Sequence, residues 1–202
     1  PLYKAAGVDY VVMGVESLED EVVTTVRKDN PFAISKQAVQ LLRDHHIISL
    51  TNLIYGLEDE TTATLQNKFA KLLELDSDIL NAVYLTPHFW TADGRATDPA
   101  SIMQPDQAKW TYRNQVIATP NLSPSQLFCG VKLTEALYHL RPNGLKRLFC
   151  GGDARIRHIM RASMAVGVRV MLAETAEFVA DRVRAWLAGP RPAPASPPTA
   201  LV

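Results

Sequence analysis

Apolar residues gather in three short blocks in the first half of the chain, and each block gives way to polar or glycine residues. The blocks lie at 8–14, 47–55 and 79–86. They are rich in β-branched residues and nearly continuous rather than alternating, which is typical of strands buried on both faces of a parallel sheet. We therefore predict strands at these positions.

Helical spacing fills the stretches between the predicted strands. Ser17 with Asp20 fits a capping box for a first helix, Ser35 is a candidate start for a second, and Thr61 or Thr62 for a third. Alternation of strand and helix predicts parallel strands joined by right-handed crossovers, with helices on one side of the sheet. Three strands are too few to close a barrel. We therefore expect the sheet to have unpaired edges.

The second half of the chain has a different pattern. Apolar residues recur at helical spacing at 105–118, 124–140 and 153–187, and prolines and a Cys-Gly-Gly-Asp turn separate these segments. A Pro/Ala-rich tail follows at 189–202, and its composition predicts disorder. The fold class expected is α/β followed by a helical region.

Composition narrows the classes of function. Lys plus Arg and Asp plus Glu both total 21, so no net charge attracts nucleic acid or an anionic membrane. No apolar run is long enough to span a membrane. The two cysteines, Cys129 and Cys150, lie too far apart for a local metal motif and are interpreted as buried thiols in a reducing, cytoplasmic compartment.

Polar residues at the strand ends are the first candidates for chemistry, because the C-terminal ends of parallel strands build active sites. Glu16 could accept hydrogen bonds from ribose hydroxyls or an amino group. It could equally well serve only as a helix-start acid favoured by the helix dipole. Asn52 and Gly56 could let a ligand approach the second strand, or Gly56 could simply form a tight turn.

The loop after the third strand holds a second group of candidates. His88, Phe89, Trp90 and Arg95 lie within eight positions of one another. Aromatic side chains beside a histidine suit a flat hydrophobic substrate. A loop that plugs the underside of the helical region is an equally good interpretation.

Several stretches are similar to a known family. "GVESLEDEVVTTVRKDN" and "ISKQAVQLLRDHHIISLTNLIYGLEDE" resemble the second half of the barrel of cobalamin-binding radical S-adenosylmethionine (SAM) enzymes. The continuation from "LNAVYLTPHFW" resembles the oxygen-independent cyclases of bacteriochlorophyll synthesis among them. The resemblance covers about residues 1–180 and implies two folded parts, the C-terminal half of a radical SAM barrel at 1–90 and a helical region at 91–188.

The resemblance implies a reaction and its cofactors. Such cyclases close the fifth ring of Mg-protoporphyrin IX monomethyl ester with oxygen from water, using a 5′-deoxyadenosyl radical. They require SAM, a [4Fe-4S] cluster, cobalamin and an electron donor protein. By motif matching, Glu16 and Ser17 correspond to positions that contact the ribose or methionine part of SAM. Positions near the adenine are Asn52, Ile54 and Gly56, and expected substrate contacts are His88, Trp90 and Arg95.

The sequence also departs from the family pattern. Asn52 stands where the Gly-x-Ile-x-Gly-x-x-Glu motif has its first glycine, and the acids after Gly56 are Asp59 and Glu60. The Cys-x-x-x-Cys-x-x-Cys motif that binds the cluster is absent. We therefore expect a C-terminal fragment that is inactive and poorly soluble alone. Two alternatives remain: another cobalamin-dependent radical enzyme, such as a methyltransferase, or a half-barrel binding module without catalysis.

Overall fold

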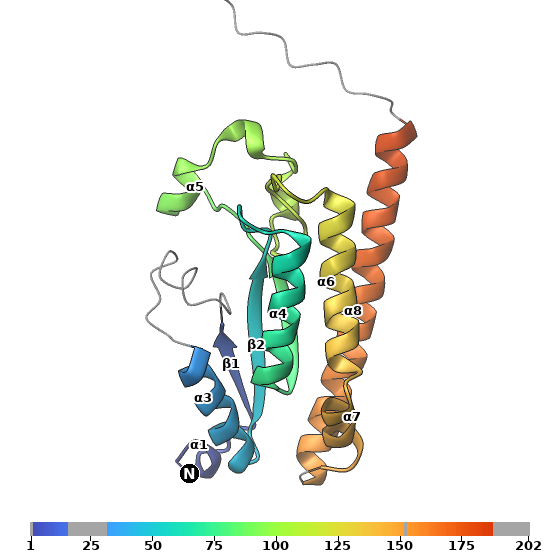
Figure 1. Cartoon of the computed structure of the whole chain (residues 1–202). Coiled ribbons are helices and arrows are strands. Elements are labelled where there is room, and N and C mark those ends of the chain that lie inside the picture. Colours follow the sequence, from blue (N-terminus) through green and yellow to red (C-terminus); the bar gives the residue numbers. More distant parts are fainter. Residues whose placement is uncertain (1, 16–31, 152, 188–202) are drawn as a thin grey trace, which may run out of the picture. The chain divides into compact units, whose positions relative to one another are not determined.

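The computed structural model describes residues 2–15, 32–151 and 153–187 of the 202-residue chain (Figure 1). It divides into two compact units, Pro1–Ser163 and Met164–Val202. The sheet, and every contact discussed below, belong to the first unit. The helix predicted to start at Ser17 and the tail at 189–202 lie outside the described residues.

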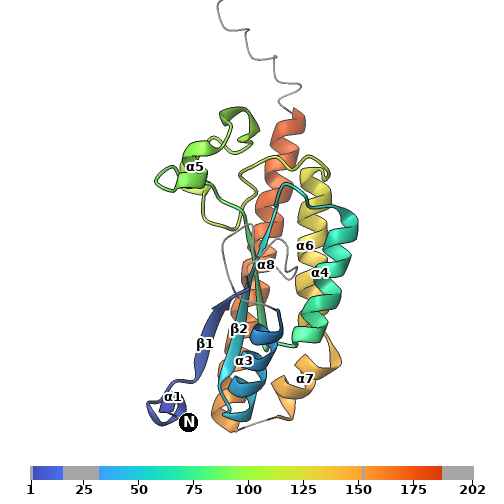
Figure 2. The same ribbon diagram turned by 60° about the vertical axis from the view of Figure 1, so that its left-hand side comes forward.

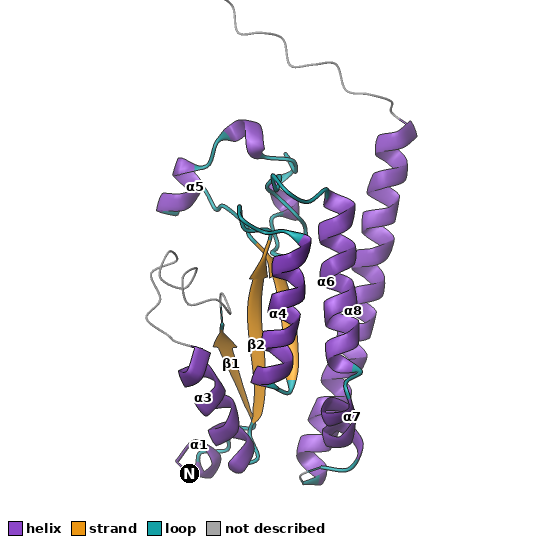
Figure 3. Cartoon of the chain, viewed as in Figure 1, coloured by secondary structure: helices purple, strands orange, loops and turns teal. Residues whose placement is uncertain are grey.

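Three strands form one parallel sheet in the order β1-β2-β3 (Figure 3). The strands are β1 (Tyr10–Gly14), β2 (Ile48–Tyr55) and β3 (Ile79–Tyr84). Each lies inside the block of apolar residues that predicted it. The parallel pairing confirms the α/β architecture expected from the helix-length connections.

The helices that lead from β1 to β2 and from β2 to β3 lie on one face of this sheet, as predicted (Figure 2). α3 (Phe32–Asp44) contacts β2, and α6 (Pro124–His139) contacts β3. α4 (Thr62–Leu75) packs between them, against both α3 and α6. The core lies between sheet and helices, and its fully buried members include Leu53, Tyr55, Leu72, Leu127 and Tyr138.

The predicted helix starts have different outcomes. Thr61 caps α4 in a capping box: its side chain accepts from Thr64 N at 3.2 Å, and Thr64 Oγ1 accepts from Thr61 N at 2.8 Å. The prediction for Ser35 is wrong, because α3 already begins at Phe32 and Ser35 is buried within its first turn. Phe32 packs against the core, and this burial extends the helix toward its N-terminus.

The segment 105–118 is not helical, which corrects the prediction of a helix there. It contains only the short turn η2 (Gln107–Lys109). Its backbone pairs with an earlier stretch instead, since Met103 N donates to Val116 O and Ala118 N donates to Ser101 O, both at 2.8 Å. The short helices α5 (Ala92–Ala96) and η1 (Pro99–Ser101) precede it. The loop after β3 is therefore long and irregular.

The helical predictions for 124–140 and 153–187 are confirmed by α6 and by α8 (Ala154–Leu187). The helix α7 (Pro142–Phe149) was not predicted, and Pro142 starts it rather than only ending its predecessor. Cys129 and Cys150 are free and exposed, so their interpretation as buried thiols is wrong. No helix within the described residues has the length and apolar character needed to cross a membrane.

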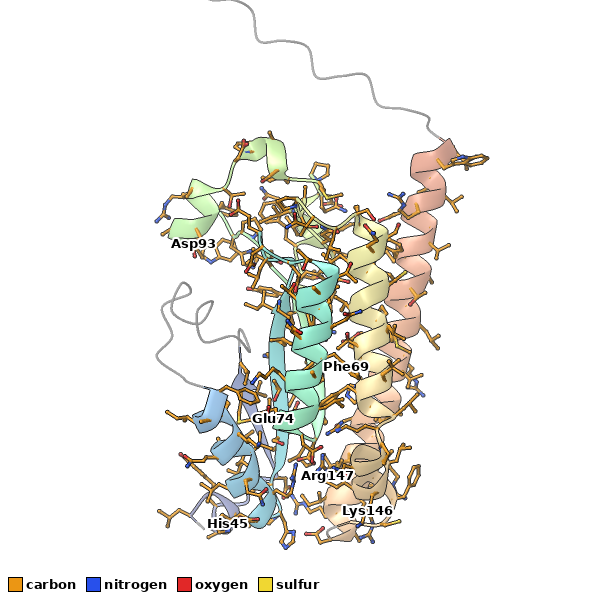
Figure 4. All side chains as sticks on the ribbon, viewed as in Figure 1. His45, Phe69, Glu74, Asp93, Lys146 and Arg147 are labelled. Atoms are coloured by element: carbon orange, nitrogen blue, oxygen red, sulfur yellow. The ribbon has the colours of Figure 1, made fainter. Side chains whose placement is uncertain are left out.

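Asp76 ties three helices together at one end of the sheet. It ends α4 in the left-handed conformation (φ 52°), where a short polar side chain is tolerated. Its carboxylate pairs with Arg141 Nε and Arg147 Nη1 at 3.0 Å, and with Arg43 Nη2 at 3.2 Å. Figure 4 shows Arg147 on α7 reaching toward the end of α4. Burial alone raises the pKa of Asp76, but the hydrogen bonds from Arg147 and Arg141 outweigh it and hold that pKa below its usual value.

Side chains of α6 cover the outer edge of β3. Leu80 N donates to His139 Nε2, and Ala82 N donates to Glu135 Oε1, both at 3.3 Å. The next outward amide, Tyr84 N, donates to Tyr112 O at 2.8 Å. The prediction of unpaired edges is therefore wrong for β3, because a helix supplies the acceptors that a further strand would supply.

We predict that His139 makes the stability of the chain depend on pH. Its Nδ1 lies 2.8 Å from Glu135 O and its Nε2 accepts from Leu80, so the ring must be neutral. Burial lowers its pKa. The stabilisation is therefore complete above the unfolded-state pKa of about 6.5. It is lost as the pH falls through the lowered folded-state pKa.

Urea unfolding at several pH values tests this role. His139→Gln should cost roughly 1–3 kcal/mol at neutral pH, because it removes the acceptor of a buried amide, and the pH dependence between neutral and mildly acid conditions should flatten. His158→Gln, at an exposed position on α8, is the matched control. It should change neither the free energy of unfolding at neutral pH nor its pH dependence. An unaltered pH profile in His139→Gln would contradict the assignment.

Candidate functional site

The two faces of the sheet differ in their surroundings. Leu53, Leu80 and Ala82 point toward the helices and are almost fully buried. Alternate residues point to the opposite face, which we call the open face, and there Val12 is 52% exposed. The open face is formed by Tyr10, Val12, Gly14, Ile48, Leu50, Asn52, Ile54, Ile79, Asn81 and Val83, of which Ile48, at the start of β2, is buried.

Two asparagines meet on this largely apolar surface. The strand register pairs Asn52 with Gly14 on one side and with Asn81 on the other. Asn81 Nδ2 donates to Asn52 Oδ1 at 2.8 Å. Gly14 places no side chain beside Asn52 on that side. The next row holds Ile54 and Val83, which the register also pairs.

The end of β2 is held by a buried ion pair. Gly56 follows the strand with φ 84°, a conformation that favours glycine, and its N–H donates to Glu60 Oε2. The other oxygen, Glu60 Oε1, accepts from Lys68 of α4. The side chain of Glu60 is 0% exposed and that of Lys68 is 5% exposed. Lys68 Nζ also lies 5.2 Å from the ring centroid of Tyr55. Burial, and next the charge of Glu60, raise the pKa of Tyr55.

The loop after β3 gathers aromatic side chains at the protein surface. His88 stacks on Trp90 with ring centroids 4.3 Å apart and an interplanar angle of 13°. Phe89 meets Trp90 edge-on at 4.9 Å, and both are about 60% exposed. His88 Nε2 lies 2.8 Å from the hydroxyl of Tyr112. Arg95 Nη1 donates to Trp90 O at 2.9 Å.

Tyr112 is held in an unusual backbone conformation. Its φ is 63°, which is rare for a bulky aromatic residue. The other non-glycine residues with positive φ in the described part of the chain, His46 and Asp76, both follow helix ends, where the left-handed conformation is common. Tyr112 follows no helix of that kind, and its carbonyl and hydroxyl bind Tyr84 and His88. Strain of this kind often accompanies functional sites.

Comparison with known proteins gives a consistent assignment. The chain is 32% identical, over 177 residues, to the anaerobic magnesium-protoporphyrin IX monomethyl ester cyclase of Synechocystis sp., a match that covers 88% of this chain and 36% of that protein. The enzyme of the same name from Rubrivivax gelatinosus is 32% identical over 87 residues, or 43% of this chain and 16% of that protein. The chain is a relative of these cyclases.

A solved structure supports the fold of this cyclase relative. The radical SAM methyltransferase TsrM from Kitasatospora setae, solved with cobalamin and a [4Fe-4S] cluster bound, superposes with a TM-score of 0.50 and 17% identity. The superposition covers 82% of this chain and 42% of TsrM. No family model matches the chain. The chain spans about a third of the length of the Synechocystis cyclase.

The structure brings some of the predicted cyclase site residues together. Asn52 and Ile54 share the open face, and Gly56 ends the same strand. His88, Trp90 and Arg95 form one connected group in the loop. Glu16 and Ser17 lie outside the described residues, so their assignment stays a prediction.

Three residues of the site were not found from the sequence. Asn81 could have been suspected, because it interrupts an apolar strand, but its partner depends on the register. Glu60, and not Asp59 at the motif position, binds back to Gly56, while Asp59 is exposed. Tyr112 gives no signal in the sequence, since its contact with His88 spans 24 positions of irregular loop.

The residues present fit some of the expected cofactors of the cyclases and not others. The sequence contains only Cys129 and Cys150, which cannot supply three thiolates to a [4Fe-4S] cluster. Within the described residues no group of three or more His, Cys, Asp or Glu side chains gathers. The open face, with its amide pair and aliphatic row, fits the nucleoside of SAM.

Proposed function

We propose that this chain forms the nucleoside-binding and substrate-binding part of a radical SAM oxidative cyclase that acts on Mg-protoporphyrin IX monomethyl ester. The observation that carries the proposal is the 32% identity over 88% of the chain to a cyclase of that name. In the parent reaction, SAM supplies a 5′-deoxyadenosyl radical when it is bound and reduced. Cobalamin and an electron donor protein are further expected partners, to which we assign no residue of this chain.

The open face is the proposed site for the nucleoside of SAM. Asn52 offers hydrogen-bonding groups beside the side-chain-free Gly14, and Ile54 offers an aliphatic surface. Gly56, fixed by Glu60, ends the strand in a left-handed conformation that favours glycine. Because no residues here fit the iron-sulfur cluster, we derive no step through it.

The loop after β3 is the proposed site for the macrocycle. The exposed rings of Phe89 and Trp90 can contact a flat tetrapyrrole, and Tyr112 holds His88 against Trp90. The substrate named for the cyclases is a monomethyl ester, so one propionate stays charged. Arg95 is exposed and uses one nitrogen on Trp90 O, which leaves donors for that carboxylate.

Product analysis tests the proposed function. The longest reading frame that encodes this chain should be purified anaerobically and supplied with iron and sulfide, cobalamin, SAM, a reductant and Mg-protoporphyrin IX monomethyl ester. We expect a five-ring product that carries heavy oxygen when the reaction is run in labelled water. Unlabelled product, or unchanged substrate with intact cluster and SAM cleavage, would contradict the proposal.

Variants of the loop test the macrocycle site separately. Trp90→Ala should raise the KM for the macrocycle by roughly two- to tenfold, the effect of losing one aromatic contact of about 0.5–1.5 kcal/mol. SAM cleavage without substrate should be unchanged. Trp110→Ala, which removes an indole bound to Gln104 O outside this group, is the matched control. Equal effects of the two variants would remove the loop from the substrate site.

The second candidate is a methyltransferase that uses the same cofactors. The observation that favours it is the fold shared with the methyltransferase TsrM. The same product analysis separates the two reactions, because methyl transfer replaces a hydrogen by a methyl group and takes no oxygen from water.

A further inference from the structure

We propose that His88 is an axial ligand of the magnesium ion at the centre of the macrocycle, and that it selects the magnesium-loaded substrate over the metal-free ring. The inference rests on the proposed function, because it assumes that the tetrapyrrole binds at the loop after β3. It deepens that function by assigning a metal contact to one residue of the loop. Magnesium prefers six ligands, and the macrocycle supplies only four of them, so its two axial positions remain for other ligands.

One nitrogen of the His88 ring is available to a metal ion. His88 Nε2 lies 2.8 Å from the hydroxyl of Tyr112. No group within the described residues forms a hydrogen bond with the other nitrogen, Nδ1, and the side chain is only half-buried. Imidazole with one unengaged nitrogen is the side-chain group that most often binds a metal ion in proteins.

Tyr112 supplies the second contact that a metal-binding histidine needs. When a metal ion binds Nδ1, the ring proton resides on Nε2 and needs an acceptor nearby. The Tyr112 hydroxyl can both donate and accept, so it can pair with Nε2 before and after the metal binds. The carbonyl oxygen of Tyr112 accepts from Tyr84 N at 2.8 Å, which ties this residue to the end of β3. The strained backbone of Tyr112 therefore holds the hydroxyl beside the imidazole.

The backbone of His88 is fixed on both sides. Its N–H donates to Thr86 O at 3.0 Å, and its carbonyl oxygen accepts from Thr91 N at 2.9 Å and from Thr91 Oγ1 at 2.7 Å. Gly94 packs directly against the same carbonyl group, since a Cβ on Gly94 would lie 1.9 Å from His88 O. Only glycine fits there. These contacts hold the imidazole in place before a ligand arrives, which a binding site requires.

The neighbouring rings have orientations that suit an axial ligand. An imidazole that binds the metal stands perpendicular to the macrocycle. Trp90 lies nearly parallel to His88, at 13°, so it covers a face of the imidazole and not its nitrogens. Phe89 lies at 80° to Trp90 and is 60% exposed, so its face can lie parallel to the macrocycle.

An oxygen atom is the competing axial ligand, because magnesium ordinarily prefers oxygen. The hydroxyl of Tyr112 is the nearest protein oxygen of this kind, and water is the other source. A magnesium-bound Tyr112 would leave Nε2 of His88 without its partner. Packing of the loop alone would need neither an unengaged Nδ1 nor the strained Tyr112.

The experiment compares Mg-protoporphyrin IX monomethyl ester with the same ester without metal. Both are titrated, without SAM or reductant, into the protein encoded by the longest reading frame that contains the chain, and binding is followed by absorption spectroscopy. The wild type should prefer the magnesium form by at least roughly tenfold, since loss even of a residue that only orients a metal ligand costs about 10–100-fold in affinity. In His88→Gly the two affinities should agree to within about twofold, because the bond made only by the magnesium form is lost.

Added imidazole separates a metal ligand from a packing residue. It fits the space that His88→Gly creates beside Trp90, so it should restore the preference for the magnesium form. If both forms bind His88→Gly more weakly and imidazole restores neither, the residue only packs the loop and the inference is overturned. His46→Gly, at an exposed position with φ 54° where glycine is tolerated, is the matched control and should bind both forms as the wild type does.

A second variant tests the oxygen ligand. Tyr112→Phe keeps the imidazole and removes the hydroxyl, so it should retain part of the preference for the magnesium form. If Tyr112→Phe abolishes this preference while His88→Gly keeps it, the tyrosine oxygen is the ligand and the inference is overturned. Equal binding of both forms by the wild type overturns the inference but leaves the proposed function standing, whereas binding of neither form overturns both.

Discussion

Glu60→Ala is expected to lower the free energy of unfolding by about 3–5 kcal/mol, because it leaves the ammonium group of Lys68 buried without its partner. Both side chains are almost completely buried. The substitution also removes the acceptor of Gly56 N–H, so the end of β2 loses its anchor. Urea unfolding measures the first effect, and the affinity for S-adenosylhomocysteine measures the second.

A double substitution distinguishes the destabilisation caused by an unpaired buried charge from the net stability that the ion pair contributes. Glu60→Leu with Lys68→Met replaces two buried charges by apolar side chains of similar size, and such replacements are often neutral or stabilising. We expect the double variant to regain most of the stability lost in Glu60→Ala, while its ligand affinity stays low because Gly56 is still unanchored. A double variant no more stable than Glu60→Ala would mean that the pair contributes net stability.

Asp76→Asn is expected to lower the free energy of unfolding by about 3 kcal/mol. Asparagine tolerates the left-handed backbone and keeps the shape of the side chain, so the change isolates the charge that pairs with three arginines. The loss of the negative charge is most costly at Arg141, because its side chain is only 6% exposed. Thermal and urea unfolding measure the loss.

Acid titration provides a second measurement of the same cluster. Because the folded-state pKa of Asp76 is lowered, its stabilisation is complete above the unfolded-state value of about 3.9 and is lost as the pH falls through the lowered value. Asp76→Asn should therefore flatten the acid end of the stability profile. Asp93→Asn, at an exposed position on α5, is the control and should follow the wild type (Figure 4). Parallel acid profiles for all three proteins would exclude Asp76 as the titrating group.

Much of the fold follows from local pattern. The apolar blocks at 8–14, 47–55 and 79–86 each contain one strand, because buried parallel strands need apolar residues on both faces. The segment 105–118 was misassigned because its backbone bonds lead to residues 101 and 103, a pairing that helical spacing does not encode.

The candidate site was predictable only where a residue acts within its own strand or loop. Asn52, Ile54 and Gly56 belong to one motif, and His88, Trp90 and Arg95 to one loop. Asn81 joins Asn52 through the offset between two strands, and the sequence does not specify that offset. Glu60 was missed because the side chain that bonds to Gly56 comes from one position beyond the motif acid.

The covering of β3 by α6 leaves the sheet with a single available edge in the described part of the chain, that of β1. Open-ended fibres need two adhesive edges on every molecule, one to receive a neighbour and one to pass the association on. When a molecule has one such edge, pairing with its first partner occupies that edge and leaves none for a second partner. Self-association through the described edges of the sheet should therefore stop at pairs.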